Sequence, residues 1–140
     1  MTGIAWNDSL SVGINLIDEQ HKMLIQKIKD LSDAIDRQQG ADKILLTLDF
    51  MIKYTDFHFG TEEKHMRELS YPAMEDHIQK HQEFKEMLQN MLADFDEEGA
   101  TKALGDSINT YLMNWLVNHI TRTDVAFGQF LKEKGLSELE

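Results

Sequence analysis

The sequence contains no cysteine, a single proline and eight glycines among its 140 residues. The lack of cysteine excludes disulfide bonds, iron–sulfur clusters and zinc sites with thiolate ligands, so any metal must be bound through nitrogen and oxygen. Because proline and glycine are the residues least suited to a helix interior, their scarcity leaves long segments free to form helices. We therefore expect an all-α protein.

Basic residues and long apolar runs are also scarce. Lysine and arginine number 14 against 25 aspartates and glutamates, which gives a net charge of −11. Nucleic acids require a basic protein face, so we expect no nucleic-acid partner. No apolar run approaches the roughly 18 residues of a membrane span, and the N-terminal residues lack the basic patch and hydrophobic stretch of a secretory signal. We expect a cytoplasmic protein.

The chain is long enough for one domain with a proper core. Apolar residues recur at three- and four-residue spacing in four segments, which predicts helices over about 18–36, 41–69, 72–95 and 101–122. Short connections make neighbouring helices antiparallel, so we expect an up-down-up-down four-helix bundle over 17–124. An arm over residues 1–16 should close over the helix ends, and a short helix and tail should follow over 125–140. We expect no attached sensor or catalytic module.

Histidines lie on the apolar stripes of all four predicted helices. A buried imidazole needs a hydrogen-bond partner for each polar nitrogen, and a single one is ordinarily a satisfied core residue. Five of them converging from four helices favour a metal site instead. These five are His21, His58, His77, His81 and His119.

Two spacings along the helices support this interpretation. His58 and Glu62 are four residues apart, as are His77 and His81. Four residues advance roughly 400° around a helix and rise about 6 Å, so such side chains can reach one metal or an adjacent pair. Each spacing alone is a weak signal, because a surface hydrogen bond or a solvated face produces it equally well.

Three other residues fit a shared site less well. His65 lies about 10 Å beyond His58 along the same stripe, so we expect it to support the site or to lie at the surface. Glu63 points about 100° away from its glutamate neighbour and is predicted to face solvent. Asp124 follows His119 by five residues, about 140° around a regular helix, so its carboxylate can turn inward only if the helix loosens or ends there. A capping or surface role for this aspartate stays equally open.

Four segments of the chain form a recognisable set: WNDSLSVGINLIDEQHKML at 6–24, HFGTEE at 58–63, HIQKH at 77–81 and HITRTD at 119–124. In order and spacing, these segments together resemble those of the single-domain bacteriohemerythrins in the hemerythrin family. The resemblance runs from Trp6 to beyond Asp124, and the combination is specific although no single piece is.

This resemblance implies a non-haem di-iron site with two iron ions, an oxo or hydroxo bridge and two bridging carboxylates. With these bridges a three-histidine iron is fully coordinated, whereas a two-histidine iron is five-coordinate and keeps a position for a diatomic ligand. The implied ligands are His77, His81 and His119 on the first iron, His21 and His58 on the second, and Glu62 and Asp124 as bridges.

The resemblance also implies reversible O2 binding. O2 would bind the five-coordinate iron, take one electron from each Fe(II) and the proton of the bridging hydroxide, and be held as hydroperoxide. We therefore expect an oxygen carrier, storage or delivery protein and no enzyme, with O2, NO or other small anions as ligands, and a monomer is compatible with this role. Apolar residues would keep the pocket dry, or serve only as core: Leu24, Phe59, Trp115, Leu116 and Ile120.

Other classes compete with this hypothesis. A ferritin-like iron-storage or oxidase protein uses two Glu-x-x-His motifs, and this chain has one, Glu62 with His65. A zinc hydrolase needs three ligands and a general base, and no H-E-x-x-H helix is present. A di-iron oxygen or redox sensor stays open as an alternative, although the fused signalling module that would favour sensing is not expected here.

Overall fold

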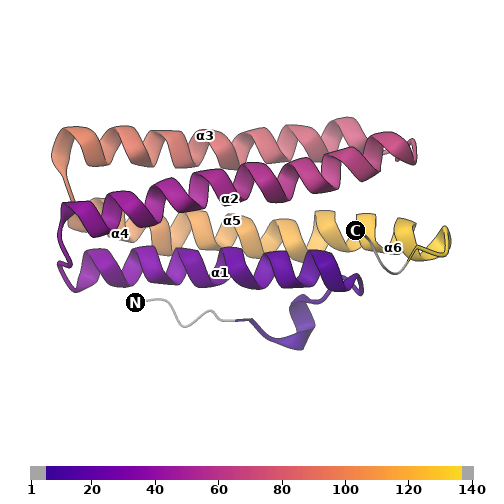
Figure 1. The fold of residues 1–140 in the computed structure, drawn as a ribbon, viewed down its shortest axis with the longest axis horizontal. Coiled ribbons are helices and arrows are strands. Elements are labelled where there is room, and N and C mark those ends of the chain that lie inside the picture. Colours follow the sequence, from indigo (N-terminus) through magenta and orange to yellow (C-terminus); the bar gives the residue numbers. More distant parts are fainter. Residues whose placement is uncertain (1–5, 137–140) are drawn as a thin grey trace.

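The computed structural model describes residues 6–136, which form helices and connecting turns without any strand. Four long helical rods lie side by side, and the chain reverses direction at each connection (Figure 1). The first three rods are α1 (Asn15–Asp36), α2 (Ala41–Glu68) and α3 (Met74–Glu98). The predicted all-α, up-down-up-down antiparallel bundle is confirmed.

The fourth rod is built from five consecutive segments. They are α4 (Lys102–Ser107), η2 (Ile108–Leu112), α5 (Met113–Asn118), η3 (His119–Asp124) and α6 (Val125–Glu133). The backbone stays in the right-handed helical region at every junction, so the predicted short C-terminal helix is α6 and continues the rod without a break.

Two segments of this rod, η2 and η3, are π-helical. A π turn pairs residues five apart, one more than an α turn, and such turns occur frequently at functional sites. The η3 segment is the HITRTD sequence that ends in Asp124. The helix therefore loosens at the place where the five-residue step from His119 required it.

The turns between the rods place residues in the left-handed region, where glycine is favoured. Gly40 precedes α2 with φ 95°, and Gly99 follows α3 with φ 75°. Ser70 adopts φ 53° after α2 without being a glycine. The third helix was predicted to begin at about residue 72, but Pro72 lies in the turn before α3, because the chain is still reversing direction there.

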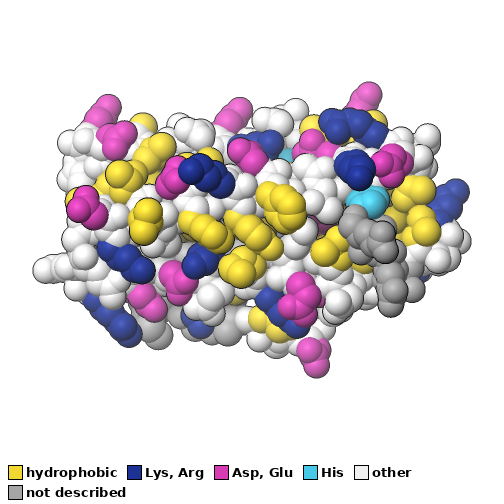
Figure 2. All heavy atoms as spheres, viewed as in Figure 1, with side chains coloured by type: hydrophobic (Ala, Val, Ile, Leu, Met, Phe, Trp, Pro, Cys, Tyr) yellow, Lys and Arg dark blue, Asp and Glu magenta, His cyan; other side chains and the backbone are white. Residues whose placement is uncertain are grey.

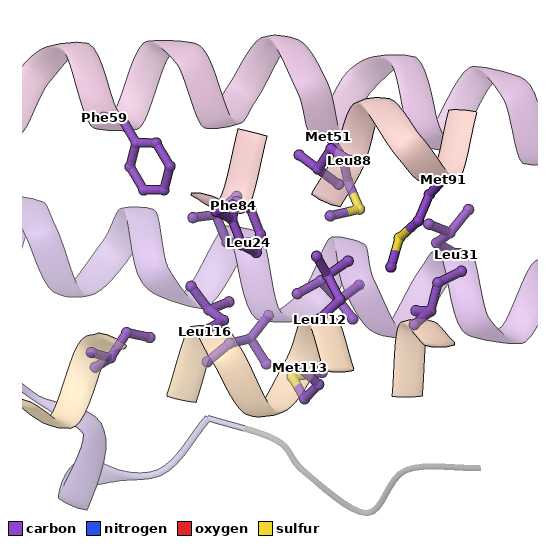
Figure 3. Packing of buried hydrophobic residues seen from close by; sticks show 14 of the residues in the cluster. Leu24, Leu31, Met51, Phe59, Phe84, Leu88, Met91, Leu112, Met113 and Leu116 are labelled. Atoms are coloured by element: carbon purple, nitrogen blue, oxygen red, sulfur yellow. The ribbon is translucent and has the colours of Figure 1, made fainter. Parts of the chain in front are cut away.

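Large apolar side chains from all four rods fill the interior (Figure 3). Burying each one contributes about 1.5–3 kcal/mol relative to leaving it exposed. The core includes Leu24 and Leu31 of α1, Met51 and Phe59 of α2, Phe84, Leu88 and Met91 of α3, and Leu112, Met113 and Leu116 of the fourth rod.

The arm before α1 packs onto the bundle through its buried side chains Leu10, Val12 and Ile14. Its backbone is fixed to the first turn of α1, where Asp18 accepts hydrogen bonds from the Val12 amide at 2.9 Å and the Ser11 hydroxyl at 2.5 Å. A carboxylate near a helix N-terminus also interacts favourably with the helix dipole. The described part of the arm is therefore a structural element of the bundle.

The surface mixes acidic and basic side chains, with hydrophobic ones between them over α1 and α2 (Figure 2). The exposed large hydrophobic residues of these two helices are Met23, Leu45, Leu46, Phe50 and Phe57. Within residues 6–136, no helix is both long and apolar enough to cross a membrane.

Candidate metal centre

Seven side chains of the types that bind metals meet in the half of the bundle that contains the start of α1 and the end of α2. Each rod contributes at least one of them, and none is more than 4% exposed. They are His21 of α1, His58 and Glu62 of α2, His77 and His81 of α3, and His119 and Asp124 of η3.

Their ligand atoms form two overlapping groups, and within each group these atoms all lie within 4.8 Å of one another. Both carboxylates belong to both groups, which differ in having three histidines in one and two in the other. The three-histidine group is Glu62, His77, His81, His119 and Asp124; the two-histidine group is His21, His58, Glu62 and Asp124.

Several of these atoms are close without being hydrogen-bonded. Nε2 of His21 lies 2.9 Å from Oδ2 of Asp124, Nε2 of His77 lies 3.0 Å from Oδ1, and Nε2 of His81 lies 3.2 Å from Oε1 of Glu62. Yet, within the described part of the chain, none of these atoms has a hydrogen-bond partner of acceptable geometry. An unsatisfied buried polar atom costs about 1–3 kcal/mol, so this concentration of them indicates a shared ligand. Metal ions satisfy such a set directly.

Two histidines are oriented by hydrogen bonds at their other ring nitrogen. Nδ1 of His58 lies 2.5 Å from Oε1 of Gln20, and Nδ1 of His81 lies 2.8 Å from Oε2 of Glu63. Both oxygens are acceptors, so each histidine donates from Nδ1 and turns its Nε2 towards the ligand groups, where it could bind a metal once deprotonated.

The expectation that Glu63 faces solvent was wrong. Its exposed fraction is 9%, and it accepts the hydrogen bond from His81. The reason is that α2 packs against both α1 and α3, so its buried arc is wider than one stripe. Gln20 was missed altogether, although its position directly before His21, on the buried side of α1, was an available signal.

His65 lies outside both ligand groups. Its side chain is partly buried, and its Nδ1 is 4.0 Å from Oε2 of Glu68. That position agrees with the expected distance of about two helical turns from His58.

Four of the five predicted pocket residues are fully buried, namely Leu24, Phe59, Leu116 and Ile120. The Phe59 ring stacks on His81, with ring centroids 3.7 Å apart and an interplanar angle of 3°.

Trp115, the fifth, differs from the expectation of a dry interior. It is only partly buried, stacks on His119 at 4.7 Å, and donates from Nε1 to Oε1 of Glu83 at 3.3 Å. It lines an open surface hollow of about 380 Å³ beside the three-histidine group.

The pKa values of the candidate ligands are shifted in different directions. Burial lowers the pKa of His81, but the adjacent carboxylates of Glu62 and Glu63 outweigh burial and raise this pKa to about 9. Burial, together with a neighbouring histidine, holds the pKa of His58 well below its ordinary value. Burial raises the pKa of Asp124, but the charges of the adjacent histidines outweigh it and hold the value well below the usual range. A metal must therefore displace a proton from His81.

The comparison with known families is decisive. The family model described as the hemerythrin HHE cation binding domain matches residues 12–130. The chain belongs to the hemerythrin family. Among hemerythrins, it is 32% identical to a bacteriohemerythrin of Stenotrophomonas maltophilia over 94% of this chain and 84% of that protein. It is 30% identical to a bacteriohemerythrin of Pseudomonas aeruginosa over 99% of this chain and 88% of that protein.

The similarity extends to animal hemerythrins. A myohemerythrin of Theromyzon tessulatum is 33% identical over 87% of this chain and 88% of its own length. The resemblance read from the sequence segments is thus confirmed at the level of the family.

Proposed function

We propose that this hemerythrin binds O2 reversibly at a non-haem di-iron site. The supporting observation is the pair of ligand groups, which are buried and share two carboxylates, and whose Nε2 and carboxylate oxygen atoms have no hydrogen-bond partner among the described residues. The donor chemistry fits, because imidazole and carboxylate ligands suit iron, whereas thiolates are absent from the chain.

The proposed assignment follows the two groups. His77, His81 and His119 would hold one iron, His21 and His58 the other, and Glu62 and Asp124 would bridge them together with an oxo or hydroxo group. When bound, the iron pair would supply two electrons to O2, held as hydroperoxide at the position with one ligand fewer.

The protein's own residues provide orientation and exclusion of water. Gln20 and Glu63 fix the imidazoles of His58 and His81 so that Nε2 is the free nitrogen. The four buried apolar side chains that we predict at the pocket would keep water from the iron pair and slow the irreversible oxidation that water and protons promote: Leu24, Phe59, Leu116 and Ile120. This chemistry needs no acid or base from the protein, so we propose a binding protein and not an enzyme.

A ferritin-like alternative is less well supported. That class would place a second Glu-x-x-His motif at the metals, but the single match includes His65, which lies outside both groups. An oxygen or redox sensor would use the same site and differ in reversibility. The cytoplasmic location and the monomeric state stay predictions.

The test is an optical spectrum of the anaerobically reduced, iron-loaded protein before O2, after O2, and after O2 is removed. A charge-transfer band that appears with O2 and disappears with it supports the proposal. A band that forms once and persists points to an oxidase, storage or redox-sensing protein. The absence of any iron-dependent band would refute the site itself.

A further inference from the structure

In each ligand group, one histidine is oriented by a hydrogen bond from its Nδ1, and the acceptor differs between the two groups. In the three-histidine group, Nδ1 of His81 donates to a carboxylate oxygen of Glu63 at 2.8 Å. In the two-histidine group, Nδ1 of His58 donates to the amide oxygen of Gln20 at 2.5 Å. Both acceptors are buried, so solvent does not level the difference between a charged and a neutral partner.

We propose that Glu63 is a positioning residue that makes the two metal positions electronically unequal, favouring the ferric state at the three-histidine position. A carboxylate acceptor draws the Nδ1 proton towards itself and makes Nε2 a stronger donor, and an amide does so less. A stronger donor stabilises the higher oxidation state of the metal that it binds. This inference rests on the proposed di-iron function.

Arg67 connects this pair to the surface. It lies one turn after Glu63 on α2, with Nη2 3.7 Å from Oε1 of Glu63, and its side chain is 60% exposed. Glu63 is thus placed between a buried imidazole and an exposed guanidinium. The positive charge of Arg67 opposes the effect of Glu63 on His81, in a weak interaction that solvent screens.

This arrangement predicts opposite effects for two substitutions. Removing the charge of Glu63 makes Nε2 of His81 a weaker donor, so the ferrous form becomes more stable relative to the ferric form. Removing the charge of Arg67 takes away the positive charge that partly offsets the Glu63 carboxylate, so the ferric form becomes more stable relative to the ferrous form. A purely structural role, in which either change merely disorders His81, would shift both variants in the same direction.

The first experiment is a reductive titration of the iron-loaded protein and its variants, with iron per chain measured for each. Glu63→Gln keeps the shape of the side chain and an oxygen acceptor, and should favour the ferrous form about tenfold, equivalent to about 59 mV for one electron. Arg67→Gln should favour the ferric form by about two- to threefold, as expected for an exposed charge.

Lys64→Gln is the matched control. Lys64 is an exposed cation on the same turn of α2, paired with Glu68 at 4.0 Å and not with Glu63. Lys64→Gln should leave the reduction potential of the iron site unchanged. Equal shifts in Lys64→Gln and Arg67→Gln would mean that bulk charge is responsible, and shifts of the same sign in Glu63→Gln and Arg67→Gln would mean disorder of His81. Either result would overturn the proposal.

The second experiment needs no redox chemistry. Zinc(II), which is diamagnetic and redox-silent, is loaded in place of iron, and the Nδ1 protons of His81 and His58 are observed by nitrogen-edited NMR. Glu63→Gln should move the His81 resonance upfield and leave that of His58 in place. An unmoved His81 resonance would refute the charged hydrogen bond.

The outcomes separate this inference from the proposed function. Reversible O2 binding with the same reduction potential in the parent protein and Glu63→Gln would refute the inference alone. A chain that binds zinc with the expected Nδ1 resonances but shows no reversible O2 band refutes the proposed function alone. A chain that binds neither metal refutes both.

Discussion

Nε2 of His119 lies 3.3 Å from Oδ1 of Asp124, although five residues separate the two along the chain. A regular α-helix would hold these side chains about 140° apart. The π turn between them removes this angle, and α6 then continues in helical register to bury Phe127 and Leu131. One local loosening therefore serves the site while leaving the packing of the rod intact.

Removing a ligand should have a different effect from removing a histidine nearby. We expect His58→Ala and Glu62→Ala to abolish the paired site, because each belongs to the ligand groups. His65→Ala is the matched control on the same helix, and should leave iron at about two per chain, as a coupled two-metal site requires. Iron is measured by colorimetric assay after gel filtration. Equal losses in all three variants would contradict the assignment.

The apolar residues predicted at the pocket should slow autoxidation. Leu116 is fully buried, and Leu116→Ala should open a cavity that admits water, at a cost of about 2–5 kcal/mol in stability. We expect iron to be retained and the O2-dependent band to decay several-fold faster. Trp115→Phe, at the partly exposed edge, should change the decay less. Unchanged decay in Leu116→Ala would make this residue a core residue only.

The sequence predicted most of the fold because apolar spacing is a strong signal over long helices. The first helix, predicted over about 18–36 from its apolar spacing, is observed as α1 over Asn15–Asp36 with its isoleucines and leucines at that spacing buried. The sequence could not predict Glu63, because which side of α2 is buried depends on how α3 packs against it. Asp124 was uncertain for a similar reason, since a π turn has no clear signature in residue spacing and only the family resemblance pointed to it.

Removing the metal should make stability depend on pH in a defined direction. The folded-state pKa of His81 is raised to about 9 from 6.5, because the adjacent carboxylates of Glu62 and Glu63 outweigh burial. A raised histidine pKa stabilises the fold fully below pH 6.5, and this contribution is lost as the pH rises towards about 9. Urea unfolding of the metal-free protein at a series of pH values should therefore show a falling free energy across this window.

Metal binding should show the opposite dependence. Because His81 must lose its proton to bind a metal, the apparent affinity should rise with pH up to about 9. Proton release, followed with an indicator dye during zinc titration at pH 7, reports this directly. Glu63→Gln should bring the folded-state pKa of His81 closer to 6.5, so stability and metal affinity should both change over a narrower pH range. A metal-free protein whose stability is flat between pH 6.5 and 9 would contradict the assigned proton.

Two glycines in helices should respond in opposite ways to alanine. A Cβ added at Gly128 would lie 2.5 Å from the carbonyl oxygen of Val12, a backbone atom of the arm, so the arm must shift away from α6. Such overpacking costs about 1–3 kcal/mol, and we expect Gly128→Ala to lower the melting temperature. Nothing lies within 4 Å of a Cβ at Gly60, in the interior of α2, so Gly60→Ala should stabilise the protein by about 1 kcal/mol. Thermal unfolding of the metal-free variants distinguishes the two, and a stabilising Gly128→Ala would mean that the arm does not pack tightly against α6.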